Sequence, residues 1–241
     1  RERQQQTRDM QSSAESRMTI DQSTYLLSIA DAGFNSGVVG LVASRLAESH
    51  YRPAIVGAIA DGEIRASCRS IHELHITQAL DECADLMVRH GGHSAAAGFT
   101  VKEENWPLLV DRLEKITLRE LGGLDLRPRV KIDAELPLAS LKPELLDWIE
   151  LLEPTGMNNA SPIFCTRGVE PRNVKVIGME RTHLRFKAGQ QNLVFDTVGF
   201  NMAAWRDNMP SKIDIAYYFE KNSWQGRTSL QLRLADLRPS D

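Results

Sequence analysis

The sequence predicts an α/β domain with a mixed sheet and flanking helices, followed by a small β-barrel of the OB type. In the first half, "STYLLSIA" and "RPAIVGAIA" are apolar segments of strand length. They flank "VVGLVASRLAESH", whose apolar positions repeat with a helical period, as in a parallel βαβ unit. From Ile163 onward, five short strand-like segments are separated by turn residues, a pattern typical of a five-stranded barrel.

The elements of the first half follow in chain order. Residues 1–18 are polar and compatible with a helix, without an apolar stripe to anchor it. After the strand at 23–30 we expect a helix over Gly37–His50 with Ser36 as its N-cap. Asp61-Gly62, between two strand-like segments, predicts a hairpin whose return strand is "EIRASCRSI". The remaining predicted elements are a helix from Ile76 to Arg89 ended by Gly91, a short strand to about Val101, and a helix over Trp106–Leu121.

The second half changes character at Gly122-Gly123 and Pro128, which mark a boundary. A helix near Pro143–Leu152 comes before the barrel. The five barrel strands are predicted at "VKVIG", "THLRFKA", "NLVFDTVGF", "KIDIAYYFE" and "TSLQLRLADL". A sandwich edge or another small barrel fits the same pattern.

Composition narrows the class of protein. The 241 residues are 42% hydrophobic and 25% charged, a globular profile. Three scattered cysteines without a CxxC pair predict reduced thiols in the cytoplasm, and no apolar run approaches the ~20 residues of a membrane span. The net charge of −3 does not by itself predict a nucleic-acid partner. However, residues 163–241 carry 12 Lys and Arg against 8 Asp and Glu, so a polyanion would meet this end of the chain.

Period-two alternation in the return strand places Arg65, Ser67 and Arg69 on one face. Two guanidinium groups flanking a hydroxyl can clamp a phosphate, and an ordinary exposed strand face explains the same pattern. Nearby, "MVRHGGHSAAAGFTV" surrounds His93 with glycines and alanines. Such a stretch either stops a helix and packs tightly, or presents an imidazole and backbone N–H groups to an anion.

The predicted barrel offers a second, weaker site. Alternation in "THLRFKA" sets His183, Arg185 and Lys187 opposite two apolar residues. Tyr218 alternates away from its apolar neighbours, and Trp224 lies in the loop "EKNSWQGR". Cations beside aromatic rings are what sequence-tolerant binding of single strands uses. Packing of Trp224 over the barrel end is the alternative.

In order and spacing, "GVVGLVASRL", "RPAIV", "RASCRSI", "LHITQAL" and "RHGGHSAAAGFTV" resemble the C-terminal half of the RecJ family of single-stranded-DNA exonucleases. "LEPTGMNNASPIF" and "SLQLRLADLRP" continue the resemblance into that family's OB-fold ending. GGHxxAAG is specific for the DHH-associated domain. The chain departs from the family's GSGRS at "ASCRS", where Ala66 and Cys68 replace glycines and could narrow the approach to a phosphate.

The resemblance implies a division of the chain and a set of site residues. Residues 1–20 would end the helix that connects to a DHH nuclease domain absent from this chain, residues 21–122 would form the DHH-associated domain, and residues 123–241 a linker helix and the OB-fold. The phosphate-binding residues carried over are Ser67, Arg69, Ser70, Gly91, Gly92, His93 and Gly98. We expect a capping or structural role for His75, and we expect His50, His72, His90 and His183 to be surface or structural residues.

The implied function is substrate binding for a 5′→3′ single-stranded-DNA exonuclease of DNA repair and recombination. We expect no catalytic or metal-binding residue here, because the Mn²⁺ or Mg²⁺ of the family belongs to the DHH domain, and we therefore expect this chain alone to be inactive. The expected partners are single-stranded DNA and other repair or replication proteins, with no membrane association and a monomeric state. Two alternatives stay open: a DHH phosphoesterase acting on short oligonucleotides or cyclic dinucleotides, and a non-catalytic scaffold that binds single strands at replication forks.

Overall fold

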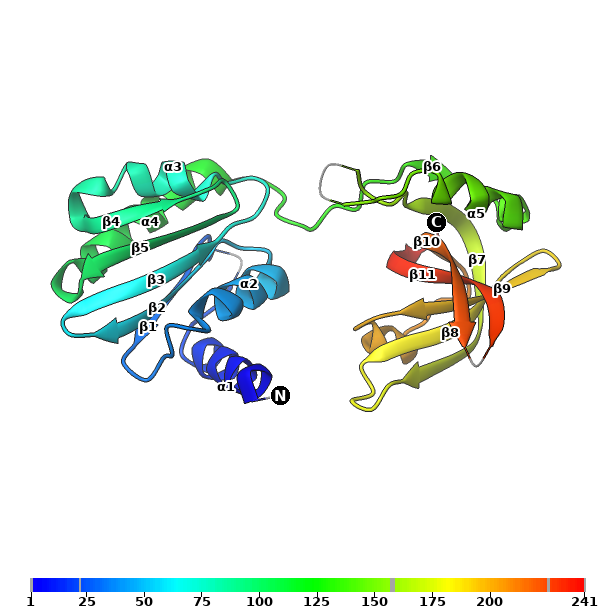
Figure 1. Ribbon diagram of the computed structural model, residues 1–241, viewed down its shortest axis with the longest axis horizontal. Coiled ribbons are helices and arrows are strands. Elements are labelled where there is room, and N and C mark those ends of the chain that lie inside the picture. The colour runs from blue at the N-terminus through cyan, green and yellow to red at the C-terminus, as the bar shows by residue number, and fades with distance from the viewer. Residues whose placement is uncertain (1, 22, 157–158, 225, 241) are drawn as a thin grey trace. The chain divides into compact units, whose positions relative to one another are not determined.

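The computed structural model describes residues 2–21, 23–156, 159–224 and 226–240. The chain divides into two compact units, Arg1–Pro128 and Arg129–Asp241 (Figure 1). The first contains a five-stranded sheet between helices, and the second a closed barrel. None of the helices in the described ranges is long and apolar enough to cross a membrane.

The sheet of the first unit has the strand order β1-β2-β3-β5-β4. Its strands are β1 (Leu27–Asp31), β2 (Ala54–Ala60), β3 (Glu63–Arg69), β4 (Met87–Gly92) and β5 (Ala96–Lys102). The pair β1–β2 is parallel and the other pairs are antiparallel, so the predicted βαβ unit and mixed sheet are confirmed. Asp61 and Gly62 have φ values of 53° and 74°, which suit a tight two-residue hairpin turn between β2 and β3, as predicted.

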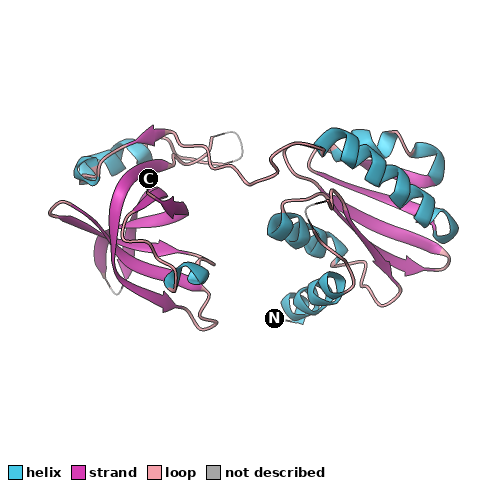
Figure 2. Ribbon diagram, turned by 180° about the vertical axis from the view of Figure 1, so that it is seen from behind, coloured by secondary structure: helices cyan, strands magenta, loops and turns pink. Residues whose placement is uncertain are grey.

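Helices cover the two faces of this sheet unequally (Figures 1 and 2). On one face, α3 (Ile76–Asp81) and α4 (Trp106–Leu121) enclose the apolar side chains of β3 and β5, including Ile64 and Phe99. On the other face, α2 (Val39–His50) packs on β2 and β3, and α1 (Glu2–Ser16) packs against α2. Their apolar cluster also includes Leu27 and Ile29 of β1. The apolar cluster under α1 and α2 contains no described residue of β4 or β5. The two 3₁₀ turns of this unit are Ala84–Leu86 and Glu103–Asn105.

Three local expectations need correction. The helix after β1 begins at Val39 rather than Gly37, and Ser36 is not its cap. The side chain of Asn35 instead accepts a hydrogen bond from the N–H of Gly37, which forms a turn ahead of the helix. The N-terminal segment is anchored after all, because Met10 and Ala14 of α1 are buried with the residues of α2.

The third correction concerns residues 76–89, which are not one continuous helix. Helix α3 ends at Asp81, and Met87–Gly92 form the edge strand β4. The apolar period that suggests a helix is satisfied by Ile76, Leu80 and Cys83, all buried against the core. Beyond them, the backbone groups of β4 find partners on β5, so sheet pairing replaces the last helical turns.

The second unit has the strand order β10-β11-β9-β8-β7-β6, and β10 also pairs with β7, which closes the barrel. The pair β9–β11 is parallel, and the other pairs around the closed ring are antiparallel. A five-stranded closed barrel of this kind confirms the predicted OB-like fold. Its strands are β6 (Ala134–Glu135), β7 (Phe164–Ile177), β8 (His183–Gln190), β9 (Leu193–Gly199), β10 (Ile213–Trp224) and β11 (Arg227–Pro239). Its helical segments are the 3₁₀ turn Leu138–Ser140, α5 (Pro143–Glu150) and the 3₁₀ turn Ala203–Arg206.

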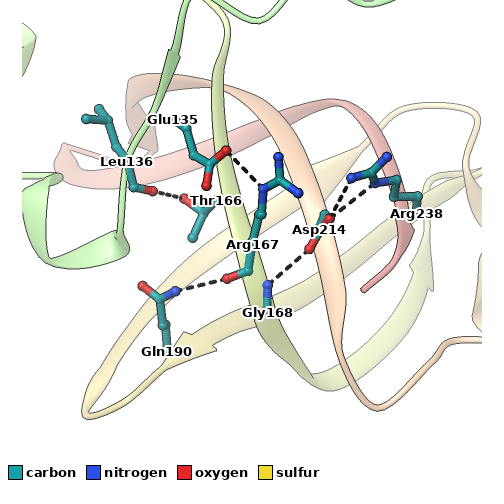
Figure 3. A network of polar contacts seen from close by, with 8 residues as sticks. All are labelled: Glu135, Leu136, Thr166, Arg167, Gly168, Gln190, Asp214 and Arg238. Atoms are coloured by element: carbon teal, nitrogen blue, oxygen red, sulfur yellow. Dashed lines mark hydrogen bonds and ion pairs between the residues drawn. The ribbon is translucent and has the colours of Figure 1, made fainter. Parts of the chain in front are cut away.

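A polar network holds β7 to its neighbours where the barrel closes (Figure 3). Asp214 of β10 is buried and accepts hydrogen bonds from the N–H of Gly168 at 3.2 Å and from Arg238 Nη2 at 3.0 Å. Burial opposes ionisation of Asp214, but bonds from Ser240, Gly168 and Arg238 outweigh it, so the pKa of this carboxyl lies below its usual 3.8. On the other side of β7, Arg167 pairs with Glu135 of β6. These contacts fix β7 between β6 and β10.

Candidate functional site

The uneven cover of the sheet leaves an open half-face, which we define as the side of β3, β5 and β4 turned away from α3 and α4. Helix α2 contacts β3 beside it. Across it, Ser67 of β3 pairs with Gly98 of β5, and Gly98 pairs with Gly91 of β4. Residues paired across a sheet lie on the same face. These three residues form a row that begins at the Ser67 hydroxyl, crosses Gly98 and ends at Gly91 on the edge strand, where Gly91 is exposed.

Ser67 and Arg69 lie where the open half-face meets the first turn of α2. A Cβ atom added to Gly40 would lie 3.5 Å from Ser67 Oγ and 3.5 Å from Arg69 Nη2, so the helix approaches both side chains closely. Arg69 Nη1 donates to the carbonyl of Cys68 at 2.8 Å, which orients the guanidinium. Helix α2 has no side-chain N-cap hydrogen bond, and the partial positive charge of its first turn adds to that of Arg69. This corner suits an anion.

Ala66 and Cys68 do not narrow this corner. Both side chains are buried on the opposite face of β3, in the apolar cluster under α3 and α4. The expectation that they crowd a phosphate is therefore wrong, because alternation along the strand turns them away from Ser67 and Arg69. Burial raises the pKa of the Cys68 thiol to about 12, although the neighbouring Arg69 charge lowers it.

The glycine–alanine stretch forms the β4–β5 hairpin and not a helix stop. Gly92 is packed tightly, since a Cβ there would lie 2.4 Å from the carbonyl oxygen of Ala96. Gly91 is the opposite case, because a Cβ there would meet no atom within 4 Å. Gly98 is intermediate, with the carbonyl oxygen of Ala66 at 3.3 Å from such an atom. Close packing thus explains Gly92, and open space above the sheet surrounds Gly91.

His93 lies in the hairpin turn and is exposed, and its N–H donates to the carbonyl of Ala96 at 2.8 Å. Ala96 is also the cross-strand partner of Arg69, so Arg69 and His93 flank the same residue at one end of the sheet. Ser70 is near as well, but its hydroxyl donates to the carbonyl of Leu74 at 2.8 Å. The structure therefore brings Ser67, Gly98 and Gly91 into one row beside Arg69 and places His93 in the adjacent turn, where its carbonyl also accepts from Thr77 of α3. It uses Ser70 and Gly92 in local packing and turns.

Three other histidines of this unit, His75, His90 and His50, have structural contacts. His75 is the N-cap of α3, and its Nδ1 accepts a hydrogen bond from the N–H of Gln78, which bears out the capping role. His90 Nε2 lies 2.8 Å from Asp81, and His50 Nε2 lies 3.4 Å from Glu15. His72 is exposed.

The exterior of the barrel gathers the second set of predicted residues. Leu184 and Phe186 are buried, which confirms that Arg185 and Lys187 point outward. Ladder pairs connect Arg185 to Val198, Val198 to Arg233 and Arg233 to Tyr218. Arg233 lies over the Tyr218 ring, with its Cζ atom 4.0 Å from the ring centroid, a cation–π contact. Cations and an aromatic ring thus share one face.

Contacts with an acidic residue and with the barrel itself make these exterior residues less available to a DNA strand. Asp196 Oδ1 lies 3.6 Å from Arg185 and 3.8 Å from Lys187. His183 Nδ1 accepts from the N–H of Asn201 at 3.2 Å, and its ring packs edge-on against Phe200. The side chain of Trp224 lies outside the described residues. Sequence patterns did not reveal Arg233 or Asp196, because their positions beside Tyr218 and Lys187 depend on strand register.

The residues that the structure describes do not fit a metal centre. Within the described ranges, no group of three or more His, Cys, Asp or Glu side chains could hold a metal ion. Burial also raises the pKa of the Cys83 thiol to about 11, and that of Cys165 above its usual range, so both thiols favour the protonated form.

Comparison with known proteins first defines the two domains. Residues 22–118 match the family model of the DHHA1 domain, and residues 132–236 match that of the RecJ OB domain. The two matches fall on the sheet unit and on the barrel, respectively.

The chain carries, in this order, a DHHA1 domain and a RecJ OB domain. It is 34% identical over 217 residues to the single-stranded-DNA-specific exonuclease RecJ of Bacillus subtilis, covering 88% of this chain and 28% of that protein. The corresponding Thermus thermophilus protein is 30% identical over 219 residues, or 87% of this chain and 29% of the relative. A crystal structure of Thermus thermophilus RecJ with Mn²⁺ matches the whole chain and 34% of its own, with a TM-score of 0.82 and 27% identity. The Mg²⁺ complex matches with a TM-score of 0.80 and 26% identity. The chain thus spans about a third of these relatives.

Proposed function

We propose that this chain binds single-stranded DNA and positions it for hydrolysis, as the substrate-binding part of a 5′→3′ exonuclease specific for single strands and acting in DNA repair or recombination. The observation that carries the proposal is the convergence of Ser67, Arg69 and the two glycines Gly91 and Gly98 on the open half-face. The relatives are single-stranded-DNA-specific exonucleases, which supports the substrate class.

Each group has a distinct task in this proposal. The Arg69 guanidinium, held by the carbonyl of Cys68, forms charge-assisted hydrogen bonds to a strand phosphate. The Ser67 hydroxyl adds a donor, and the bare surface at Gly91 and Gly98 lets the sugar–phosphate backbone lie close to the sheet. His93, at the same end, contacts a neighbouring phosphate oxygen. These residues bind and orient, and proton transfer is not assigned to them.

Hydrolysis itself is assigned to another part of the complete protein. The Mn²⁺ or Mg²⁺ bound by the structural relatives would supply an activated water there. The described residues of this chain bring no such ligand set together. This chain alone is therefore expected to release no nucleotides from DNA. Separately, we propose that the protein acts as a monomer in the cytoplasm.

The test uses the complete protein that contains this chain, with DNA labelled at either end. Nucleotides should be released from the 5′ end of single strands and not from duplex. Arg69→Ala and His93→Ala should each lower the rate about 10-fold or more, equivalent to ~1.4 kcal/mol or more of transition-state stabilisation. Because both residues would contact one strand, the double variant should lose less than the two single losses combined.

Two results would overturn the proposal. One is release of nucleotides with the wrong selectivity, either from the 3′ end or equally from duplex and single strands. The other is a His93→Ala variant that unfolds while Arg69→Ala keeps the full rate, since the hairpin would then serve packing alone. Thermal unfolding of each variant, which should be nearly unchanged because His93 is exposed and Arg69 is half-buried, separates these cases.

A further inference from the structure

Two further arginines, Arg65 and Arg89, lie on the open half-face, nearer the β2–β3 hairpin than Ser67 and Arg69. Arg65 of β3 pairs with Thr100 of β5, and Thr100 pairs with Arg89 of β4. The two arginines thus flank one threonine in a straight row across three strands, with their Cα atoms about 10 Å apart at the usual strand spacing. Arg89 Nε donates to Thr100 Oγ1 at 3.2 Å, which fixes the direction of its side chain.

These side chains line a cavity of about 270 Å³ together with Gly98, Phe99 and His90. Both arginines are exposed, whereas Thr100 is only 4% exposed beneath them. The cavity therefore has a polar floor and two guanidinium groups at its rim. Its volume is near the lower end of the range for small-ligand sites.

Neither arginine has an acidic partner among the described residues, and Thr100 is the only side chain there that either one bonds. Three arginines of this unit, in contrast, have acidic partners: Arg17 pairs with Asp31, Arg112 with Asp85 and Arg119 with Glu82. Two like charges held over one cavity repel each other. An anion bound between them would remove that repulsion and satisfy the free donors.

We propose that Arg65, Arg89 and Thr100 form a second phosphate-binding subsite on the open half-face. It rests on the proposed function, because the phosphate it would take is that of a DNA strand already held at Ser67 and Arg69. Arg65 and Arg69 are four residues apart on β3, or about 13 Å. One phosphate cannot bridge that distance, so the two subsites bind different phosphates.

The test compares two double variants with the same change in net charge. Arg65→Gln/Arg89→Gln removes the subsite, and Arg112→Gln/Arg119→Gln removes two arginines of α4, on the covered face. Binding of 3′-fluorescein-labelled oligo(dT) is measured by anisotropy at several salt concentrations. The slope of log K against log[salt] should fall in magnitude by ~0.7 for the lost phosphate contact, with roughly 5-fold or greater weakening, in the first variant only.

A second arm distinguishes a strand phosphate from a free one. Millimolar inorganic phosphate should raise the Tm of the wild type and not that of Arg65→Gln/Arg89→Gln if the cavity also takes the free anion. An altered salt slope without this protection assigns the cavity to the DNA backbone, and protection without an altered slope assigns it to free phosphate. If neither differs from the wild type, the subsite does not exist.

Failure of the proposed function looks different from failure of the subsite. If the wild-type chain does not bind oligo(dT) at all, the proposed function fails, and the phosphate arm still decides on the subsite. If Arg69→Ala weakens DNA binding while Arg65→Gln/Arg89→Gln changes nothing, only the subsite is wrong. Should the double variant fold poorly, Arg65→Gln alone replaces it, since Arg65 makes no described hydrogen bond or ion pair that folding would lose.

Discussion

The adjacent glycines Gly91 and Gly92 should respond in opposite ways to the same substitution. In Gly92→Ala, the new Cβ would lie 2.4 Å from the carbonyl oxygen of Ala96 and 2.4 Å from the Cα of Ala97. Both atoms belong to the backbone of β5, so the hairpin must shift to relieve the overlap. In Gly91→Ala, the Cβ meets nothing within 4 Å and φ is not positive, so no strain arises.

The expected magnitudes follow from this geometry. Overpacking against fixed atoms typically costs about 1–3 kcal/mol, which we expect for Gly92→Ala. In a unit of this size, 1 kcal/mol shifts the Tm by roughly 3–5 °C, so the calorimetric transition of the DHHA1 unit should fall by about 3–15 °C. Gly91→Ala should change the free energy of unfolding by less than about 0.5 kcal/mol, as do most exposed substitutions.

Binding separates the two variants further. The methyl group of Gly91→Ala projects from the open half-face, in a cross-strand row with Gly98 and Ser67. It should therefore weaken binding of single-stranded DNA several-fold while the protein remains as stable as the wild type. Equal destabilisation by both variants would refute the packing argument. A Gly91→Ala variant that binds DNA as well as the wild type would refute close approach of the strand at this position.

Three further predictions concern buried groups. Thr166 Oγ1 donates to the carbonyl of Leu136, so the Tyr217 hydroxyl, 2.8 Å away, donates to Thr166. Tyr217→Phe should therefore lower the free energy of unfolding, measured in urea, by about 0.5–1.5 kcal/mol. An unchanged free energy of unfolding would show that this bond is not made. Because the pKa of Asp214 is depressed in the folded state, this carboxylate contributes fully to barrel stability above its unfolded pKa, and the contribution is lost as pH falls through the folded value, below about 4. Asp214→Asn should remove this part of the dependence of stability on acid. A variant with the same pH profile of stability as the wild type would contradict this prediction. The buried Cys68 thiol, with a pKa of about 12, should not react with a thiol reagent in the native protein, whereas half-buried Cys165 should react first. Peptide mapping of the labelled protein measures the order of reaction. Labelling of Cys68 before Cys165 would contradict the burial argument.

Much of the fold could be predicted from the sequence because strand alternation and turn type depend on residues that are adjacent in the chain. The alternation of β3 correctly separated Ser67 and Arg69 from the core, and Asp61-Gly62 correctly predicted the hairpin. The barrel strands were predicted for the same reason, but two of their bounds were wrong. Strand β7 begins at Phe164, well before "VKVIG", and β10 continues to Trp224, into the predicted loop. The edge strand β4 was missed, because "MVRH" continues a helical apolar pattern and only the distant β5 supplies its hydrogen bonds.

The composition of the site depended on information that adjacent residues do not carry. The row of Arg65, Thr100 and Arg89 arises from the register of three strands, and the closeness of Gly40 to Arg69 arises from the packing of α2. The sequence singled out His93 and the glycines by their unusual setting, but it did not reveal that Gly92 is packed and Gly91 is open. That difference depends on where the backbone of β5 lies.

The most direct test of the central claim is a titration of the chain with matched single-stranded and duplex DNA at low and physiological salt. We expect tighter binding of the single strand, a steep loss of affinity as salt rises, and weaker binding by Arg69→Ala but not by the control Arg112→Gln on α4. Equal binding of the two DNA forms, or Arg69→Ala binding as tightly as the wild type, would contradict the assignment of the open half-face as the site that holds the strand.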